Sequence, residues 1–477
     1  MLFSKLIAIT LYICALLTVA LFSYKRNQSS ADYIIGGRGL NFWLTALAAH
    51  ASDMSSWLLM AYPAVIFTQG MPQAWIGIGL ILFMLLNWIY VAPKIRGATE
   101  KYNSMTLSSF FESRYHDTSG LIRIITAIML FVFYTIYISA GLMGLGLLLE
   151  SIFNWNYYLG ITIGTAVVIP YLFIGGYTTL AWTDLFQGLF LMSVCIFVPF
   201  YVLNTHLAGI GSITSAALEK NISLRLLPST SVEGYLSVIL IMLGWGLGYF
   251  GQPHIITKFM GIKNVSEMKK AMYVGMSWQT ITLACATLIG LVAIAYHPDY
   301  LDNPQLVFVN MVNAIFSPFF ATFILCAIFA ATISAVDSQI LVLASSLAED
   351  FYKRVIHKNA SSKTIILVSR LSIFIVSTIA YLIAFVKINT IFALVSYAWS
   401  GLGATFGPVL LMGLYSKSAN KYGAWAGIFS GGVLAATWPY FNQLLKTDIP
   451  SIVPAFALSI SLIWIVSKFT QKQLTHT

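Results

Sequence analysis

Three carboxylic acids stand inside long apolar runs of this sequence, and they are the residues from which chemistry is most readily expected. Asp53, Asp184 and Asp337 lie in such runs, and His50 is the histidine at a similar depth. If the runs cross a membrane, each charged group costs roughly 3 kcal/mol on insertion scales, which makes it a functional candidate by default. No lysine or arginine is expected beside the acids within the membrane. The missing counter-charge would then be a bound cation or a proton, unless backbone N–H groups or hydroxyls satisfy each carboxyl.

The run around Asp53 reads ASDMSSW from Ala51, and it interrupts a stretch that is otherwise apolar from Phe42 to Phe67. Ser and Asp side chains compete with a helix for backbone hydrogen bonds, so this segment is a plausible unwinding point. Non-helical backbone at membrane depth is tolerated where it is buried or lines a cavity. Its free carbonyls would suit a small cation, and the half-helix beyond them would favour an anionic group such as a carboxylate.

A second interruption is predicted in the segment GWGLGYFGQP from Gly244 to Pro253. Each glycine costs about 1 kcal/mol in a helix interior, and this segment has four followed by a proline. Trp245 and Tyr249 are four residues apart, so they share a helical face that could cover a small ligand. The alternative is close helix packing through small residues.

A third polar group stands on one predicted helix. Ser334, Asp337 and Ser338 follow an i, i+3, i+4 spacing and therefore line a single helical face. Hydroxyls that bond to their own backbone would be the alternative.

These residues must be positioned by membrane-spanning helices. The chain has 477 residues, 58% of them apolar and only 9% charged, whereas soluble domains average about 25% charged residues. This composition excludes a water-soluble or disordered protein, and the Lys and Arg residues punctuate apolar runs rather than forming a nucleic-acid-binding face. Thirteen segments are long and apolar enough to span a bilayer: 3–24, 41–68, 73–93, 121–149, 157–176, 181–204, 233–252, 273–297, 313–347, 364–386, 388–414, 423–441 and 450–469. The first is read as a helix rather than a cleaved signal, because its apolar run is long and ends in Lys25-Arg26.

The positive charges predict the orientation, since cytoplasmic loops carry the excess of Lys and Arg. With the N-terminus outside and the C-terminus inside, all but five of the 26 Lys and Arg residues fall on the cytoplasmic side. The five outside are Lys5, Lys220, Arg225, Lys387 and Lys446. The longest loop, 205–232, is then external, and no segment is long enough for a separate soluble domain.

The two predicted interruptions occupy equivalent places in two halves of five spans each, residues 41–204 and 233–414. Because five is odd, the second half would run with the opposite topology. That pattern is typical of inverted-repeat secondary transporters, whose sites lie at the midplane where broken helices meet. The expected fold is therefore an all-α membrane protein forming one transporter domain over 1–477. Residues 1–24 form an extra N-terminal helix and 423–469 two C-terminal helices.

The sequence resembles the sodium/solute symporter family, and within it most closely the sodium/proline symporters. The likeness extends over nearly the whole chain in consecutive motifs: YIIGGR from Tyr33, ASDMSSWLLM from Ala51, FYTIY from Phe133, GGYTTLAWTD ending at Asp184, WGLGYFGQPHI from Trp245, SQILVLASSLAEDFYK from Ser338 and VSYAWSGLGATFGPV from Val395. The resemblance implies the inverted repeat and sodium-coupled uptake of a small solute, most readily L-proline.

The resemblance also implies roles for particular residues. The sodium site would use the carbonyls of Ala51, Met54 and Ala331 with the hydroxyl of Ser334, and Asp53 would be the essential acid beside it. Around the substrate it would place Ser55, Tyr137, Trp245, Tyr249 and Pro253. Arg38 would stand at the cytoplasmic end of the pathway, and Asp184 would assist cation passage or a second ion.

This chain departs from the family pattern at four positions near those sites. Ala335 replaces a hydroxyl that would bind the cation, and Asp337 stands where the proline symporters have serine. We hypothesise that Asp337, with Ser338 and Asp184, compensates as a second cation site or by admitting protons. His50 and Ser56 add polar atoms near the expected pocket and indicate a substrate that is more polar than proline.

Other functions are weighed against this one. Within transport, the alternatives are sodium- or proton-coupled uptake of another amino acid, a carboxylate or a sugar. An intramembrane hydrolase would need a Ser/His, paired-Asp or HExxH arrangement, and none occurs at motif spacing; a sensor would need an output domain. The protein is therefore expected to be a non-enzymatic transporter of the bacterial inner membrane. Sodium would be its coupling ion, without an organic cofactor or a nucleic-acid partner, and its oligomeric state is left open.

Overall fold

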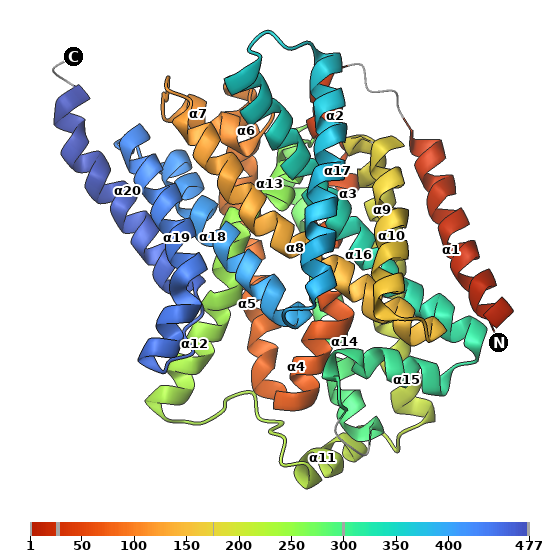
Figure 1. Cartoon of the computed structure of the whole chain (residues 1–477). Coiled ribbons are helices and arrows are strands. Elements are labelled where there is room, and N and C mark those ends of the chain that lie inside the picture. Colours follow the sequence, from red (N-terminus) through yellow and green to blue (C-terminus); the bar gives the residue numbers. More distant parts are fainter. Residues whose placement is uncertain (1, 25–28, 175, 298–300, 475–477) are drawn as a thin grey trace.

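The computed structural model describes residues 2–24, 29–174, 176–297 and 301–474, and these form helices joined by loops (Figure 1). The first half contains α1 Leu2–Ser23, α2 Ser30–Ile35, α3 Phe42–Met54, α4 Tyr62–Gln69, α5 Ala74–Leu86, α6 Ala92–Lys101, α7 Leu107–Arg114, α8 Leu121–Phe153, α9 Tyr157–Ile174 and α10 Tyr177–Thr205. The second contains α11 Ile210–Glu219, α12 Val232–Gly246, α13 Pro253–Met260, α14 Met268–Tyr296, α15 Val307–Ile315, α16 Pro318–Ser346, α17 Ser362–Val386, α18 Ile391–Tyr415, α19 Lys421–Leu445 and α20 Ile452–Leu474.

The structure supports a multi-pass membrane protein. Within the described ranges, ten helices are long and apolar enough to cross a membrane. The remaining predicted segments also correspond to helices: 41–68 to α3 and α4, 157–176 to α9, and 423–441 to α19. Segment 157–176 includes residue 175, which lies outside the described residues, as do Lys25 and Arg26. The number of segments that cross the bilayer remains a prediction.

The first predicted interruption is present, immediately after Asp53. Asn41 caps α3 by accepting a hydrogen bond from the N–H of Leu44, and the helix then runs to Met54. Ser55 follows with φ 46° and ψ −167°, a conformation that residues other than glycine rarely adopt. A π-helical turn, Trp57–Ala61, then leads into α4. The polar run therefore breaks the span into two helices, as the sequence predicts.

The second predicted interruption is also present, and close packing accompanies it. α12 ends at Gly246, a tight 3-10 turn covers Leu247–Gly251, and Gln252 is extended before α13 begins at Pro253. A Cβ atom placed on Gly251 would lie 2.7 Å from backbone atoms of Leu402, Gly403 and Gly407 on α18. Both interpretations of the glycines are therefore correct. They allow the helix to be interrupted, and they allow its backbone to approach α18 closely.

The predicted span 313–347 is wrong at its beginning. Val307–Ile315 is a separate helix, α15, and Phe316 is extended before α16 starts at Pro318. Ser317 followed by proline is a favourable helix start, because proline at the first turn has no N–H to leave unsatisfied. At its other end, α16 continues into a π-helical segment, Leu347–Ile356.

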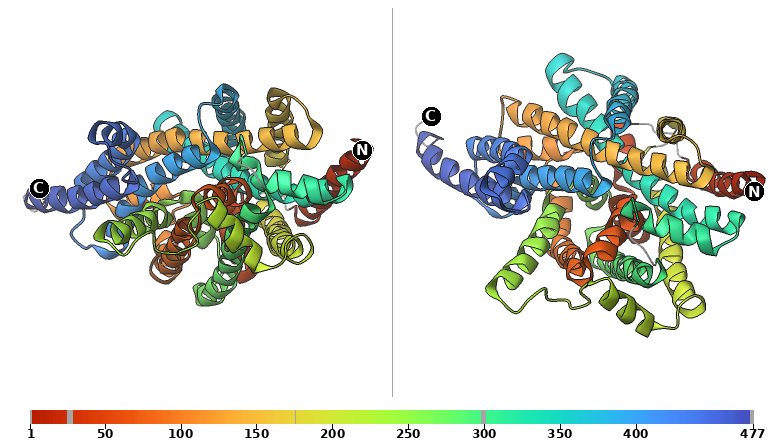
Figure 2. Two further views of the ribbon diagram at one scale, coloured as in Figure 1. Left: turned by 90° about the horizontal axis from the view of Figure 1, so that it is seen from below. Right: turned by 60° about the horizontal axis from the view of Figure 1, so that its bottom comes forward.

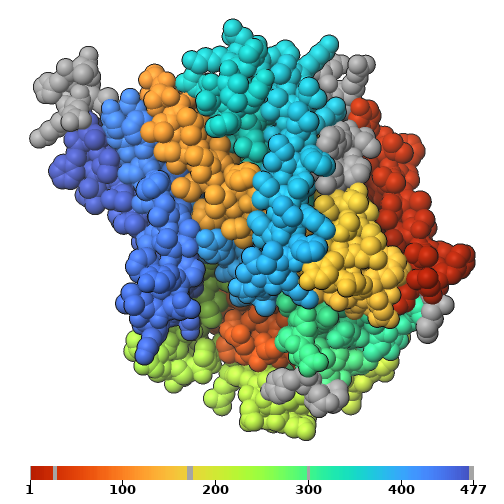
Figure 3. Space-filling model, viewed as in Figure 1, coloured from red at the N-terminus to blue at the C-terminus, as the bar shows by residue number. Residues whose placement is uncertain are grey.

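The helices that carry the candidate residues meet at the centre of the molecule. α16 packs against α3, α8 and α10, and α13 packs against α3 and α16. α1 lies at one edge, against α10 and α16, whereas α19 and α20 pack together at the opposite edge (Figures 1 and 2). Figure 3 shows the same two flanks in space-filling form. The C-terminal end of α20 and the helix α7 both lie toward the top of Figure 1, and α11 lies at the bottom.

Candidate sodium and substrate sites

The residues expected to bind sodium lie where α3, α10 and α16 meet. The Ser334 hydroxyl on α16 donates a 2.6 Å hydrogen bond to Asp184 Oδ1 on α10. One turn along α10, a Cβ on Gly188 would lie 3.0 Å from the Cβ of Ala51, so α3 packs directly against the same face. Ala331 is one turn before Ser334 on α16 and is buried. Ala51 of α3 and Ser334 of α16 therefore both contact α10, one beside Gly188 and the other at Asp184.

Asp184 has a counter-charge, which corrects the sequence-based expectation. Lys258 on α13 forms an ion pair with it, with Nζ 2.9 Å from Asp184 Oδ2. The two side chains are 2% and 1% exposed. The sequence places Lys258 in a cytoplasmic loop, because it lies between the predicted spans 233–252 and 273–297. Packing of α13 into the centre of the bundle buries it instead.

Asp337 and Ser338 share one face of α16 with Ser334, as predicted. Unlike the Ser334 hydroxyl, which bonds to Asp184, they have polar atoms without a partner in the described part of the chain. Both side chains are buried, and Asp337 Oδ1 and Ser338 Oγ have no hydrogen-bond partner among the described residues. Asp337 lies within electrostatic range of Asp184, Lys258 and Tyr12 of α1. This group therefore places unsatisfied polar atoms one turn beyond Ser334 on α16.

Asp53 connects the two interrupted helices. The hydroxyl of Tyr249, in the turn after α12, donates a 2.5 Å hydrogen bond to Asp53 Oδ2. Gln279 on α14 donates to the same tyrosine oxygen through Nε2, at 2.9 Å. Asn87 Nδ2 donates to the Tyr249 carbonyl at 3.1 Å. The contact fixes the second break against the first, a link that sequence spacing alone did not indicate.

A small cavity lies between the interrupted helices, and aromatic side chains dominate its lining. Its walls are formed by Asp53, Met54, Trp57, Leu80, Tyr137, Trp245, Val395 and Trp399. Trp245 is 5.0 Å from Trp57 and 6.4 Å from Trp399, measured between ring centroids. The Trp399 indole N–H also donates a 2.8 Å hydrogen bond to the Trp245 carbonyl. The cavity is thus an apolar box with one carboxylate in its wall.

The cavity contains part of the predicted substrate set. Tyr137 and Trp245 line it, and Tyr249 contacts it through Asp53. Ser55 stands at the break itself, where its hydroxyl accepts a hydrogen bond from the Trp57 N–H. Sequence reasoning missed Trp57, Leu80, Val395 and Trp399, although the VSYAWSG motif that contributed to the resemblance contains two of these residues.

His50 and Ser56 do not belong to the described lining of this cavity. The His50 ring is fully buried, and its Nε2 accepts a 3.1 Å hydrogen bond from the Trp88 indole N–H. Ser56 is packed beside Gly144 of α8. The two residues add no polar atom to this lining, and a substrate that is more polar than proline stays a prediction.

Pro253 lines a different cavity, on the α7 side of the aromatic box. That cavity is formed by Ile34, Met105, Thr106, Leu107, Ser108, Leu130, Pro253, Thr257, Val342, Ser345 and Ser346. This cavity therefore joins the start of α13, directly after the second break, to the start of α7.

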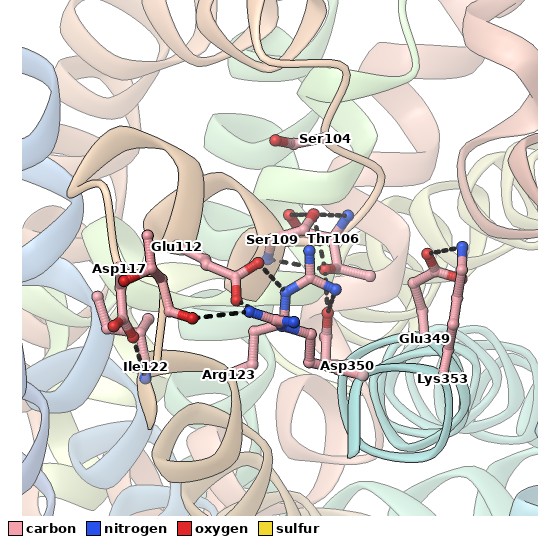
Figure 4. Close-up of polar contacts among 12 residues, drawn as sticks. Ser104, Thr106, Ser109, Glu112, Asp117, Ile122, Arg123, Glu349, Asp350 and Lys353 are labelled. Carbon is pink, nitrogen blue, oxygen red and sulfur yellow. Dashed lines mark hydrogen bonds and ion pairs between the residues drawn. The ribbon is translucent and has the colours of Figure 1, made fainter. Parts of the chain in front are cut away.

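An ionic cluster adjoins the wall of this second cavity, and its contacts are drawn in Figure 4. Asp350 accepts hydrogen bonds from two residues of the cavity wall, Thr106 at 2.8 Å and Ser346 at 2.7 Å. Arg123 Nη1 is 3.6 Å from Asp350, and its Nε is 2.7 Å from Glu112. The cluster joins the 104–118 segment and α8 to the end of α16.

Arg38 also ties segments together at the α7 end. Its guanidinium donates to the Thr99 hydroxyl and carbonyl and to the carbonyls of Ser104 and Met260, at 2.9 to 3.4 Å. Burial and the nearby charge of Arg96 lower the pKa of Arg38 from its usual value. The residue joins the end of α6 to the end of α13, beside the cavity that contains Pro253.

Comparison with known proteins identifies similar sequences over most of the chain. A sequence model described as the sodium:solute symporter family matches residues 33–431. The high-affinity proline transporter PutP of Bacillus subtilis (strain 168) is 41% identical over 461 residues, which are 96% of each chain. A sodium/proline symporter of Staphylococcus aureus (strain JH9) is 36% identical, covering 98% of this chain and 93% of that protein.

The fold is also found among solved structures. A substrate-bound, outward-open sodium-coupled sialic acid symporter, described as revealing a novel sodium site, superposes with a TM-score of 0.83. It is 18% identical and covers 98% of this chain and 97% of that one, so it supports the fold alone.

Proposed function

Because the chain belongs to the sodium:solute symporter family, and is a sodium-coupled transporter rather than an enzyme, we propose that its solute is L-proline. The observation that carries this proposal is the similarity to proline transporters over 96% of the chain. The site is compatible with it, because proline is a small zwitterion with an apolar ring, and the aromatic box offers apolar walls around one polar side.

Sodium would bind between α3 and α16. In the proposed site the carbonyls of Ala51, Met54 and Ala331 and the Ser334 hydroxyl supply hard oxygen ligands, which suit a small cation. The Ser334 hydroxyl donates a hydrogen bond to Asp184, so its oxygen lone pairs stay free for the ion. Met54 is also part of the aromatic box, so filling the sodium site would order one wall of the substrate cavity.

The substrate would lie in the box, with its ring against Trp245 and Tyr137. Its carboxylate would face the start of the half-helix beyond Ser55, where the helix dipole favours an anion. Pro253 would act later, on the exit side, together with Arg38. In this assignment Asp53 positions Tyr249 rather than binding sodium directly.

Transport would follow an alternating-access cycle across two inverted repeats of five spans, 41–204 and 233–414, with the N-terminus outside and 13 spans in all. One sodium contributes about 2.3 kcal/mol per 100 mV of membrane potential, in addition to its concentration gradient. The α7 end of the molecule would face the cytoplasm of a bacterial cell. There the Asp350 cluster would hold the exit cavity closed until the substrate is bound.

Uptake of radiolabelled proline into proteoliposomes tests the proposal. We expect accumulation with an imposed sodium gradient and none with a proton gradient alone. Unlabelled amino acids, carboxylates and sugars should leave the uptake of labelled proline unchanged. Only close proline analogues should compete with it. Stronger competition by a solute of another class would assign the box to that solute and contradict proline.

A further inference from the structure

Lys258 is a cation built into the centre of the membrane domain. It is 2% exposed and lies on α13, the half-helix beyond the second break. Its ammonium is 2.9 Å from Asp184 Oδ2 and 5.1 Å from the centroid of the Tyr177 ring. The Tyr177 hydroxyl donates a 2.9 Å hydrogen bond to the carbonyl of Thr257, the residue before Lys258, which fixes this part of α13 against α10.

The surroundings of this ammonium are those of a cation site. Asp184 and Ser334 form a continuous hydrogen-bonded link from Lys258 to the proposed sodium site. On the next turn of α16, Asp337 Oδ1 and Ser338 Oγ are buried without a partner among the described residues, and Asp337 interacts electrostatically with Lys258. Carboxylate and hydroxyl oxygens are hard ligands that would suit an alkali cation. Here the carboxylate with which such a cation would pair, Asp184, already has a positively charged partner.

We propose that Lys258 takes the place of a second coupling sodium, so that the protein binds a single sodium ion per substrate. This proposal rests on the sodium site proposed between α3 and α16. A dissociable sodium ion at Asp184 would bind and be released in every transport cycle. The sodium gradient would then contribute twice to the free energy that drives solute uptake. A tethered ammonium neutralises the same carboxylate permanently, so the acid that the sequence marks as a second-ion candidate contributes no second ion.

The test is equilibrium binding of ²²Na⁺ to the purified full-length protein, which does not depend on knowing the solute. We expect about one bound sodium for the wild type and a sodium Hill coefficient near 1. In Lys258→Met, the vacated space keeps Asp184, Asp337, Ser334 and Ser338, and we expect about two bound sodium ions with a Hill coefficient above 1. Adding Asp337→Asn to Lys258→Met should return binding to about one.

Matched variants separate this role from a purely structural ion pair. Lys258→Arg keeps the positive charge and should bind about one sodium. Lys269→Met removes an exposed lysine at the start of α14, and it should behave as the wild type. Binding of a single sodium by well-folded Lys258→Met would overturn the proposal.

Binding of about two sodium ions by the wild type would overturn it as well, whether or not any variant folds. The outcome is distinguishable from failure of the proline assignment. A wrong solute abolishes proline uptake and leaves sodium binding unchanged, whereas a wrong role for Lys258 changes the sodium count and leaves proline uptake intact.

Discussion

Asp53 and Tyr249 illustrate how a single hydrogen bond joins the two halves of the site. Tyr249→Phe removes the hydroxyl that donates to Asp53 Oδ2 at 2.5 Å, and leaves the ring in place. A hydrogen bond to a charged group contributes about 1.5–3 kcal/mol, so we expect a loss of roughly 10-fold or more in apparent substrate affinity. Uptake measured over a range of substrate concentrations checks this. Tyr273→Phe, on an exposed ring of α14, is the control, and equal behaviour of the two variants would contradict the prediction.

Trp245 tests which ligand the aromatic box holds. Trp245→Ala removes the ring between Trp57 and Trp399, and we expect about a tenfold or greater loss of substrate affinity, or about 1.4 kcal/mol. Apparent sodium affinity should change less, because the proposed ion ligands lie on α3 and α16. Paired titrations of solute and sodium measure the two effects. Equal losses would show that the ring has no specific role toward the solute.

For single residues, the sequence identifies the candidate acidic side chains more readily than the residues that contact them. An aspartate within an apolar run is visible from composition, so Asp53, Asp184 and Asp337 could be selected as candidates. Lys258 could not, because it stands five residues after Pro253 in a segment that reads as the start of a polar loop. Its burial follows from the packing of α13 against α3 and α16, a tertiary contact with no local signal.

At the scale of the helix, the glycines of the second break are expected to tolerate no side chain. Gly251→Ala places a Cβ 2.7 Å from three backbone atoms of α18, which cannot move as a flexible side chain can. Overpacking of a core typically costs about 1–3 kcal/mol, so we expect a clear loss of thermal stability in detergent. Gly97→Ala in α6 is the control, since nothing lies within 4 Å of its added Cβ. Alanine there should be neutral or stabilise by about 1 kcal/mol, and equal melting of both variants would contradict the reasoning.

The existence of the two interruptions was predictable because each has a local cause, a serine-rich run or a cluster of glycines before a proline. Their detailed shapes were less so. The strained conformation of Ser55 and the π-helical turn after it depend on packing around the break. The separate helix α15 was missed because its apolar residues run on toward those of α16. Only Ser317-Pro318 marks the new helix start.

For the molecule as a whole, the distribution of Lys and Arg predicts which loops lie outside the cell, and cysteine labelling can test that orientation. Cys195, Cys285 and Cys326 are buried and Cys14 is exposed, so Cys14→Ser provides a nearly unreactive background. In that background we expect Glu219→Cys, at the end of α11, to react with an impermeant maleimide on intact cells. Lys358→Cys, in the loop after α16, should react only after permeabilisation. Reversed accessibility would invert the predicted topology.

Apolar run length predicted nearly all of the long helices, since the bilayer imposes one physical requirement along the whole chain. It could not predict how they pack. The contact of α1 with α10 and α16, which brings Tyr12 near Asp337, depends on the tertiary arrangement of helices far apart in sequence. The same limit hid the ionic cluster around Asp350, whose members come from three separate segments.

The crowding of Trp57, Trp245 and Trp399 around one cavity has a practical consequence. Indole emission responds to local polarity and to nearby quenching groups, so this protein contains its own optical reporter. Arrival of a solute should shift its ultraviolet fluorescence without any attached dye, and stopped-flow recording could then time each step of occupancy in the unlabelled molecule.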